Sequence, residues 1–416
     1  MNQIQGMKKI WIINYYTGTP QTAANPRYLH FAKRFMEAGY EVTTFNASNR
    51  VGLTAEDFKG QPFLKKQYGS YTFVHVDVPE YQGNGMRRMY SIWSFARSVF
   101  RIRKQFEKPD VILHNIHPPF DYPIVRLAKK LKAKYITEAW DLWPADFVNF
   151  GLVKESNPAM KIAYQIEKQY YYHADEIVFA FEGGLDHLKK KGWTKDTGGK
   201  IDMSHVHYVN NGIDLKQFDA DKMRYPREDA DINNKDLYKI VYLGAINKAN
   251  NVRTLIEAAS LLKEKSNYRF FLYGDGAYRE ELEAYAKAKG LDNIVFKEKR
   301  VSFAECAWIV SQATVNVMNY EQNFGKYGVS SGKLFLYLAA GKPIVCNIDI
   351  AYDDVITENN LGVAYNMKTA EEMVEAIRHL AEQPEEEYEA MCKRVRQVAE
   401  RFDYKNLSAE ELKLIE

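Results

Sequence analysis

The chain has 416 residues, 46% of them hydrophobic and 27% charged, and a formal net charge of +3. This length is too great for one ordinary hydrophobic core and fits two domains, and no low-complexity tract points to disorder. No apolar run reaches the ~20 residues of a membrane-spanning helix, so we expect neither an anchor nor a signal peptide. Cys306, Cys346 and Cys392 lack disulfide or zinc spacing, which favours a reducing cytoplasm.

Charge is unevenly distributed along the chain. Residues 1–170 carry 24 Lys or Arg and 14 Asp or Glu, whereas the remainder carries 33 and 40. The first half is therefore basic and the second acidic. A basic domain is suited to an anionic partner such as a membrane surface, a lipid phosphate or a nucleic acid, although uneven surface charge also arises without any partner.

Strand-like and helix-like segments alternate through the first half. Residues 8–14 (KKIWIIN) and 40–46 (YEVTTFN) have the composition of strands, and the helical pattern NPRYLHFAKRFMEAG lies between them. This order is typical of a parallel sheet. We expect residues 1–214 to form one Rossmann-like domain. Further strands are predicted at residues 71–76, 109–115, 133–139, 175–181 and 204–211.

Residues 215–237 are polar, contain a proline and show no sustained period, which predicts a linker. Alternation restarts at YKIVYLG and predicts a second Rossmann-like domain over residues 238–395. Residues 396–416 are predicted to form a helix that crosses back to the first domain. The expected fold class is α/β, with two doubly wound parallel-sheet domains facing a cleft at their strand ends.

Two strand ends in the second half have features of a phosphate site. Gly244 ends a strand, and the loop AINKANN, which contains Lys248 and Asn251, leads into a helix whose free N–H groups can face an anion. Gly274, in the YGDG turn, lets the backbone approach a ligand closely. Ordinary structural turns explain both features equally well.

The segment SSGKLFLYLAAGKPIV (residues 330–345) predicts a helix that follows a polar turn and ends at Gly341, before Pro343. The hydroxyl and backbone donors at its start, together with Lys333, suit a diphosphate. Taken alone, the run is also consistent with a plain structural helix packed through its alanines.

Together with NNGID (residues 210–214), YLG-x3-KANN-x3-LIEAA and FLYGDG, this segment resembles, in order and spacing, the retaining glycosyltransferases of family 4, which share the GT-B fold. TEAWDLWPADFV (residues 137–148) is similar to the DLWP segment of a bacterial subgroup that builds O-antigen and capsule repeats on lipid carriers. The resemblance implies a nucleotide-sugar donor, with a UDP-sugar favoured. Donor binding is assigned to Gly244, Lys248, Asn251, Gly274, Arg300, Ser331, Gly332 and Lys333.

The resemblance also implies catalytic and acceptor-binding roles in the first domain. His117 matches a family histidine that touches the donor sugar near the reacting carbon, and the alternative is a strand-end histidine bonded to its own loop. Asp141, between Trp140 and Trp143, is expected to activate or hold the acceptor hydroxyl, with the two tryptophans in the acceptor site. The rival role for Asp141 is a capping carboxylate. Arg27 is expected either to hold an acceptor phosphate or to lie on the surface.

One departure from the family pattern affects the donor site. Leu336 occupies the place of the acid that binds the nucleotide ribose, and Gly328 that of the acid that binds the donor sugar. Each lost charge-assisted hydrogen bond is worth about 1.5 to 3 kcal/mol at most. Three outcomes stay open: another acid such as Glu321 substitutes, the donor is bound more weakly, or activity is lost.

Residues 86–106 (MRRMYSIWSFARSVFRIRKQF) predict a basic amphipathic helix. Its stripe of Met89, Ile92, Trp93, Ala96, Val99 and Phe100 is separate from Arg88, Arg97, Arg101 and Lys104. We expect this helix to rest on an anionic membrane surface. The alternative is a stripe that faces the core and a basic face that is simply solvated.

These patterns predict a retaining enzyme that transfers sugar from a nucleotide-diphospho-sugar to a lipid-linked or oligosaccharide acceptor. It would act in cell-surface polysaccharide biosynthesis, in the cytoplasm or peripherally on the inner face of the membrane. No cofactor, metal ion or nucleic acid is expected to take part. The alternatives are a non-hydrolysing nucleotide-sugar 2-epimerase of the same fold and a binding subunit that has lost catalysis. A nicotinamide dehydrogenase is disfavoured because no GxGxxG follows the first strand.

Overall fold

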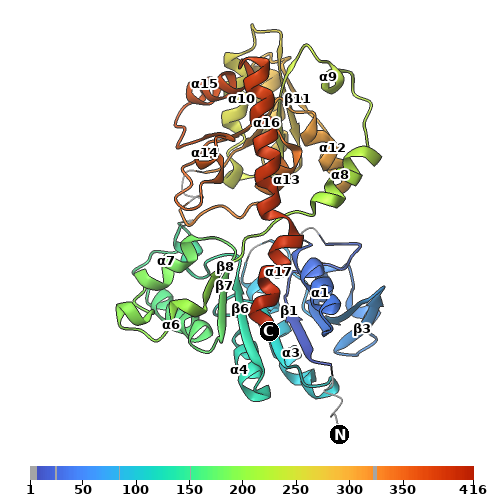
Figure 1. Ribbon diagram of the computed structural model, residues 1–416, viewed down its shortest axis with the longest axis vertical. Coiled ribbons are helices and arrows are strands. Elements are labelled where there is room, and N and C mark those ends of the chain that lie inside the picture. Colours follow the sequence, from blue (N-terminus) through green and yellow to red (C-terminus); the bar gives the residue numbers. More distant parts are fainter. Residues whose placement is uncertain (1–6, 24–25, 84, 150, 322–325) are drawn as a thin grey trace. The chain divides into compact units, whose positions relative to one another are not determined.

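The computed structural model describes residues 7–23, 26–83, 85–149, 151–321 and 326–416. The chain divides into two compact units, and Figure 1 shows that strands in each are flanked by helices. Unit 1 comprises Met1–Asn210 and Leu407–Glu416, and unit 2 comprises Asn211–Asn406. Both are α/β units with parallel sheets, which confirms the expected fold class.

The sheet of unit 1 has the strand order β3-β4-β2-β1-β5-β6-β7-β8. Every neighbouring pair is parallel except β3 and β4, which form a hairpin that the sequence patterns did not predict. The central strands are buried on both faces because helices cover them, as their apolar runs require. The strands are β1 Lys9–Ile13, β2 Glu41–Ala47, β3 Phe63–Tyr68, β4 Tyr71–Val76, β5 Val111–Asn115, β6 Lys134–Ala139, β7 Glu176–Phe179 and β8 Val206–Tyr208. The helices are α1 Arg27–Glu37, α2 Ala55–Phe58, α3 Met86–Ile102, α4 Tyr122–Leu131, α5 Ala145–Asn149, α6 Pro158–Tyr172 and α7 Gly183–Lys190.

The sheet of unit 2 has the order β11-β10-β9-β12-β13-β14 and is parallel throughout. Helix α13 lies inside this unit, and its residues from Leu334 to Ala340 are all buried. The strands are β9 Tyr238–Leu243, β10 Tyr268–Tyr273, β11 Ile294–Phe296, β12 Val315–Met318, β13 Ile344–Cys346 and β14 Gly362–Ala364. The main helices are α10 Arg253–Leu261, α11 Arg279–Ala288, α12 Phe303–Ser311, α13 Gly332–Ala340, α14 Val355–Glu358, α15 Ala370–Ala381 and α16 Glu385–Ala399.

The segment 215–237, which was expected to be an irregular linker, contains two helices of unit 2. These are α8 (Leu215–Arg224) and α9 (Ala230–Asn233). The Asp214 carboxylate accepts a hydrogen bond from the Gln217 amide at 2.8 Å and caps α8. Leu215 and Phe218 are buried in the core of unit 2. Two apolar anchors and a cap are thus enough to dock a mostly polar helix. The last helix, α17 (Tyr404–Ile415), ends within unit 1.

Helix α3 differs from its predicted amphipathic pattern at one important residue. Ile92, Ala96 and Val99 are buried as expected, but Trp93 is 36% exposed. Trp93 stacks on Tyr90, with ring centroids 5.7 Å apart, and Arg97 lies 5.1 Å above the Trp93 ring. The exposed face of α3 therefore combines aromatic and basic side chains. In the described ranges, no helix has the length and apolarity needed to cross a bilayer.

Candidate functional site

Strands β1, β5 and β6 are parallel neighbours in unit 1, so their carboxyl ends meet at one edge of the sheet. A recess of about 220 Å³ opens at this edge. The residues that follow β5 and β6 include two of the expected site residues, His117 and Asp141. The complete lining is Tyr16, Arg88, Asn115, Ile116, His117, Trp140 and Asp141.

His117 is almost fully buried and is held by its own loop. Its backbone N–H donates to Asp121 Oδ2 at 2.7 Å, and its Nδ1 lies 3.2 Å from the same oxygen. The imidazole contacts the rings of Tyr16 and Trp143 edge-on, at 5.0 and 5.3 Å between centroids. His117 is thus bonded to its own loop, as a structural histidine would be. It also lines the recess, as a ligand-binding histidine would.

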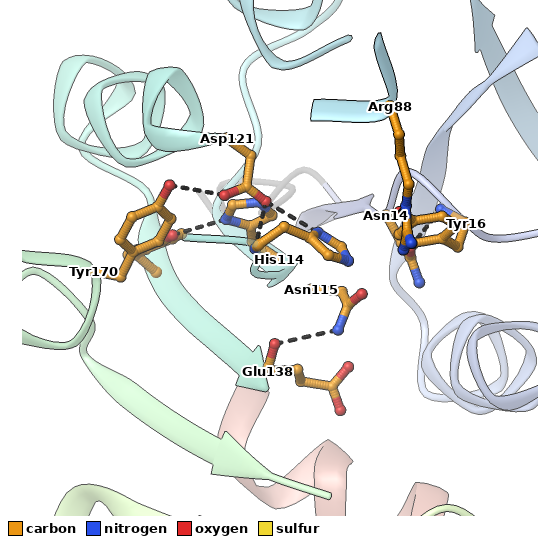
Figure 2. A network of polar contacts seen from close by, with 10 residues as sticks. Asn14, Tyr16, Arg88, His114, Asn115, Asp121, Glu138 and Tyr170 are labelled. Carbon is orange, nitrogen blue, oxygen red and sulfur yellow. Dashed lines mark hydrogen bonds and ion pairs between the residues drawn. The ribbon is translucent and has the colours of Figure 1, made fainter. Parts of the chain in front are cut away.

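Asp121 is the centre of a buried polar network (Figure 2). Tyr170, on α6, donates to Asp121 Oδ1 at 2.7 Å, and His114 Nε2 lies 3.1 Å from Oδ2. The Tyr135 hydroxyl lies 2.8 Å from the other nitrogen of His114. Burial alone would raise the pKa of Asp121, but His114 and His117 hold this pKa well below its usual range.

Asp141 lies at the rim of the recess with its side chain accessible to solvent. The protein atoms packed around the carboxyl raise its pKa, whereas His117 and Arg88 oppose the rise. The neighbouring Asp146, inside α5, accepts a hydrogen bond from the Leu142 amide at 2.8 Å. Burial, and then the nearby Asp141, raise the pKa of Asp146 to about 6.

The two tryptophans that flank Asp141 have different surroundings. Trp140 lines the recess and stacks on Tyr28, with centroids 5.2 Å apart and an interplanar angle of 19°. Trp143 is 8% exposed and packs between His117 and Phe147. Trp140 is therefore available to a ligand in the recess, while Trp143 forms the wall behind His117.

Three residues of the recess were missed by the sequence patterns: Tyr16, Arg88 and Asn115. Arg88 Nε donates to the Tyr16 hydroxyl at 2.8 Å, and the guanidinium lies 5.3 Å from the rings of both Tyr16 and Trp143. The helical pattern of α3 had placed Arg88 on a solvated basic face. The sequence signal that could have indicated Tyr16 and Asn115 is their location along the chain, at or just after the carboxyl end of a predicted strand.

Arg27 requires a correction, because it is fully buried and cannot meet an acceptor phosphate where it lies. Its Nε and Nη2 donate to Glu138 Oε1 at 3.0 and 2.5 Å. Its Nη1 donates to the Asn210 carbonyl at 2.5 Å and its Nη2 to the Val209 carbonyl at 3.0 Å. These bonds use the guanidinium to join α1, β6 and the segment after β8, so its role is structural.

In unit 2, the strand-end glycines of β9 and β10 pack backbone against backbone. Gly274 has φ of +130°, and a Cβ there would lie 1.9 Å from the Gly244 carbonyl oxygen. A Cβ on Gly244 would in turn lie 3.2 Å from Lys333 Cδ. Glycine is required at Gly274 by both conformation and space. The two strand ends and Lys333 are thereby brought together.

Lys333 lies in the first turn of α13, between two aromatic rings. Its Nζ donates to Asn250 Oδ1 at 2.8 Å and lies 4.9 and 4.4 Å from the ring centroids of Tyr242 and Tyr320. Burial lowers the pKa of Lys333 to about 7. The Tyr320 hydroxyl also donates to Ser331 Oγ at 2.7 Å. A half-buried ammonium and the open amides at the start of α13 form a cluster suited to an anion.

The other residues assigned to donor binding are placed less closely. Asn251 has φ of +40° and closes the loop after β9, where its carbonyl accepts a hydrogen bond from Asn319 at 2.6 Å. Gly332 is exposed at the start of α13. Lys248 and Arg300 are exposed, and within the described ranges no hydrogen bond or ion pair joins their side chains to the cluster.

The structure includes both positions at which the family's acidic residues are replaced. Leu336 is buried in the core of unit 2, and Gly328 has φ of +95°. The Glu321 amide donates to the Ala249 carbonyl at 2.9 Å, so this residue adjoins the loop after β9 while its side chain stays exposed.

Two units of parallel α/β architecture, with polar clusters at their strand ends, define a protein of the GT-B class. Residues 238–383, all in unit 2, match the family model described as Glycosyl transferases group 1. TuaH of Bacillus subtilis (strain 168), provisionally named a teichuronic acid biosynthesis glycosyltransferase, is 25% identical over 211 residues. That match covers 50% of this chain and 49% of TuaH, so the chain spans about half the length of this curated relative.

Solved structures support the same fold over the whole chain. Sucrose-phosphate synthase from Thermosynechococcus elongatus is 16% identical with a TM-score of 0.71, and 98% of each chain is covered. Anabaena HepE, solved in complex with UDP and glucose, is 13% identical with a TM-score of 0.63, and 98% of this chain and 99% of HepE are covered. At these identities the likeness establishes the GT-B fold.

Proposed function

We propose that this protein is a glycosyltransferase that moves a sugar from a nucleotide-diphospho-sugar, with a UDP-sugar favoured, to a lipid-linked or oligosaccharide acceptor. The observation that carries the proposal is the Lys333 cluster, which lies within the residues matched by the group 1 model and places a half-buried cation at the start of a helix. The name of TuaH supports a role in cell-surface polysaccharide biosynthesis, as in O-antigen or capsule assembly. The UDP bound to HepE supports the choice of nucleotide.

The chemistry of the Lys333 cluster suits a leaving diphosphate. Charge develops on the diphosphate as the bond to the sugar breaks, and preorganised donors stabilise that charge without a metal ion. Lys333 supplies a cation, and Ser331 and Gly332 supply the backbone donors of the first turn of α13. We therefore expect metal-independent turnover.

Unit 1 supplies the groups expected to act on the sugar and on its acceptor. In the proposed reaction, His117 orients the donor sugar beside the reacting carbon, and Asp141 holds or activates the acceptor hydroxyl. The raised pKa of Asp141 makes its carboxylate a stronger proton acceptor than an ordinary aspartate. Trp140 offers an aromatic face to the acceptor. Retention of configuration at the reacting carbon is part of this proposal.

A thermal-shift panel of UDP, GDP and dTDP with their sugars tests the donor assignment, because a ligand that binds the folded state raises its melting temperature. We expect a selective rise with UDP compounds that is lost in Lys333→Met and kept in Lys263→Met, an exposed lysine of unit 2 with no assigned role in the site. Equal shifts with all three nucleotides, or none, would refute the assignment.

Turnover separates the proposal from its two alternatives. A glycosyltransferase releases UDP and forms a glycosidic bond with an acceptor, and an anomeric assignment of the product by NMR reports retention or inversion. An epimerase returns an altered nucleotide-sugar without needing an acceptor. A binding subunit shows donor binding without turnover, and this outcome would overturn the enzymatic proposal.

A second proposal concerns the exposed face of α3, defined here as Tyr90, Trp93, Arg97 and Arg101. Aromatic side chains beside arginines are suited to the interface of an anionic membrane, where each basic residue contributes about 1 kcal/mol. In flotation assays we expect recovery with vesicles containing phosphatidylglycerol and little with neutral ones. Replacing both Arg97 and Arg101 with Gln should weaken partitioning about 30-fold. Equal recovery with both lipids would contradict this proposal.

A further inference from the structure

The recess in unit 1 borders a second set of polar groups whose purpose the proposed function does not explain. Asp121, His114, Tyr170 and Tyr135 are all buried, and they come from four separate parts of the fold: the start of α4, β5, α6 and β6. Asp121 precedes α4, where a carboxylate would ordinarily cap the helix, yet it makes no side-chain capping bond there. Its two oxygens instead bind groups on β5, on α6 and in the loop between β5 and α4.

The donors around Asp121 determine which nitrogen of His117 carries a proton. Asp121 is an acceptor, because its pKa is held low and its Oδ1 already receives the Tyr170 hydroxyl proton. The His117 Nδ1 that faces Asp121 must therefore be the protonated nitrogen. Nε2 is then left with a lone pair in the neutral ring. No hydrogen bond from the described residues occupies Nε2.

His114 and Tyr135 keep Asp121 in this role. Asp121 Oδ2 is an acceptor, so His114 Nε2, 3.1 Å away, carries a proton. In the neutral ring Nδ1 is then the acceptor of the Tyr135 hydroxyl, whose pKa burial raises well above its usual range. With Tyr170 on the other oxygen, the carboxylate is restrained from both sides and cannot rotate away from His117.

We infer that Asp121, held by Tyr170 and His114, is a positioning residue that fixes His117 as the Nδ1–H tautomer and so presents Nε2 to the recess as a hydrogen-bond acceptor. A ligand group beside His117 must then be a proton donor, as a sugar hydroxyl is. This inference rests on the proposed function for the identity of the ligand, but the tautomer is a property of the free protein. A deoxy-sugar that lacks the facing hydroxyl would leave Nε2 unpaired.

Histidine ¹⁵N NMR of the ligand-free protein tests the tautomer without any turnover. The chain has nine histidines, and loss of one ring signal in His117→Gln assigns His117. We expect the neutral wild-type ring to show a protonated Nδ1 and a bare Nε2. Asp121→Asn should convert the signal to the other tautomer or to a mixture, because a neutral carboxamide oxygen holds the Nδ1 proton less strongly than the carboxylate does. A wild-type His117 protonated at Nε2 would overturn the inference, and this result does not depend on whether any variant folds.

Kinetics supply a second, independent test with a matched control. Asp121→Asn should lower kcat by about 10- to 100-fold while changing KM for the donor less than threefold, as expected when an orienting partner is lost. Glu167→Gln is the control, because Glu167 is a buried carboxylate on α6 that accepts from His187 at 2.9 Å. It should leave kcat and the His117 signal unchanged. Equal losses of kcat in Asp121→Asn and Glu167→Gln would show that Asp121 supports only the stability of the folded protein and does not position His117.

Tyr170→Phe is a milder variant that removes one hydroxyl from the same network. We expect a partial shift of the His117 tautomer and a kcat loss smaller than that of Asp121→Asn. If wild-type protein transfers no sugar, the proposed function fails, and the NMR result still decides the inference about Asp121. If the protein transfers sugar and the Asp121→Asn tautomer is that of wild type, the inference fails and the proposed function stands.

Discussion

Replacing Arg27 with methionine separates a structural role for this residue from a ligand-binding one. Arg27 is completely buried, and its guanidinium is the paired cation of Glu138, whose side chain is 1% exposed. Removing one partner of a buried ion pair leaves an uncompensated charge and costs about 3–5 kcal/mol. The carbonyls of Val209 and Asn210 would also lose their Arg27 donors. Nearby Glu411 lies 4.0 Å from Arg27 and would lose its nearest cation.

A loss of 3–5 kcal/mol in a unit of this size corresponds to a fall in Tm of about 6–20 °C. The assay is urea unfolding with amide hydrogen exchange of unit 1, so that the effect is assigned to the unit that contains the mutation. Arg378→Met is the matched control, since the Arg378–Glu382 pair is exposed and screened by solvent, so its loss should change stability little.

The double variant Arg27→Met with Glu138→Leu should recover part of the lost stability, because two apolar groups leave no buried charge behind. A change in stability below about 1 kcal/mol for Arg27→Met, accompanied by a raised KM for the acceptor, would refute the structural role. That combination would restore the acceptor-binding role expected from the sequence.

Three further predictions concern the donor site in unit 2. Because burial lowers the pKa of Lys333 to about 7, UDP affinity should fall by up to about tenfold per pH unit above 7 as the free amine loses its proton. Calorimetry in two buffers should detect proton uptake on binding, and pH-independent affinity would contradict this. Gly274→Ala should destabilise unit 2 by about 2–5 kcal/mol, because the added Cβ clashes with the Gly244 carbonyl. Gly290→Ala is the control, since open space surrounds it, and it should cost about 1–2 kcal/mol. Thermal unfolding measures both changes. Turnover should survive EDTA, and loss of turnover that Mg²⁺ restores would refute metal independence.

Much of the architecture could be predicted because strand and helix periods are local properties of the chain. The apolar runs at β1, β5 and β9 lie where their patterns indicated, and the alternation with helices predicted parallel sheets. The segment 215–237 was mispredicted because its average polarity concealed Leu215 and Phe218, the two residues that dock α8. The β3 strand was missed because its exposed Lys65 and Lys66 give it the composition of a loop.

The candidate site was only partly predictable. Lys333 and Gly274 could be identified because a helix start and a strand-end glycine have sequence signatures. Arg88 could not, because its helix is distant in sequence from the strands that line the recess, and only the folded unit brings it to Tyr16. Asp121 was not identified from the sequence, because nothing in its neighbourhood along the chain indicated that Tyr170 would reach it.

The sequence by itself determined the order of the elements, the two-domain α/β class and the positions of the strand-end glycines, because these depend on period and on residue type. The tertiary structure decided which polar groups meet. The order β2-β1-β5-β6 places the ends of three strands side by side, which brings Tyr16, His117 and Asp141 to one recess. Burial determines the roles of two further charged residues, because a charge removed from water is stable only with its partners in place. Arg27 is a structural cation paired with Glu138, and Asp121 is the buried carboxylate that orients His117.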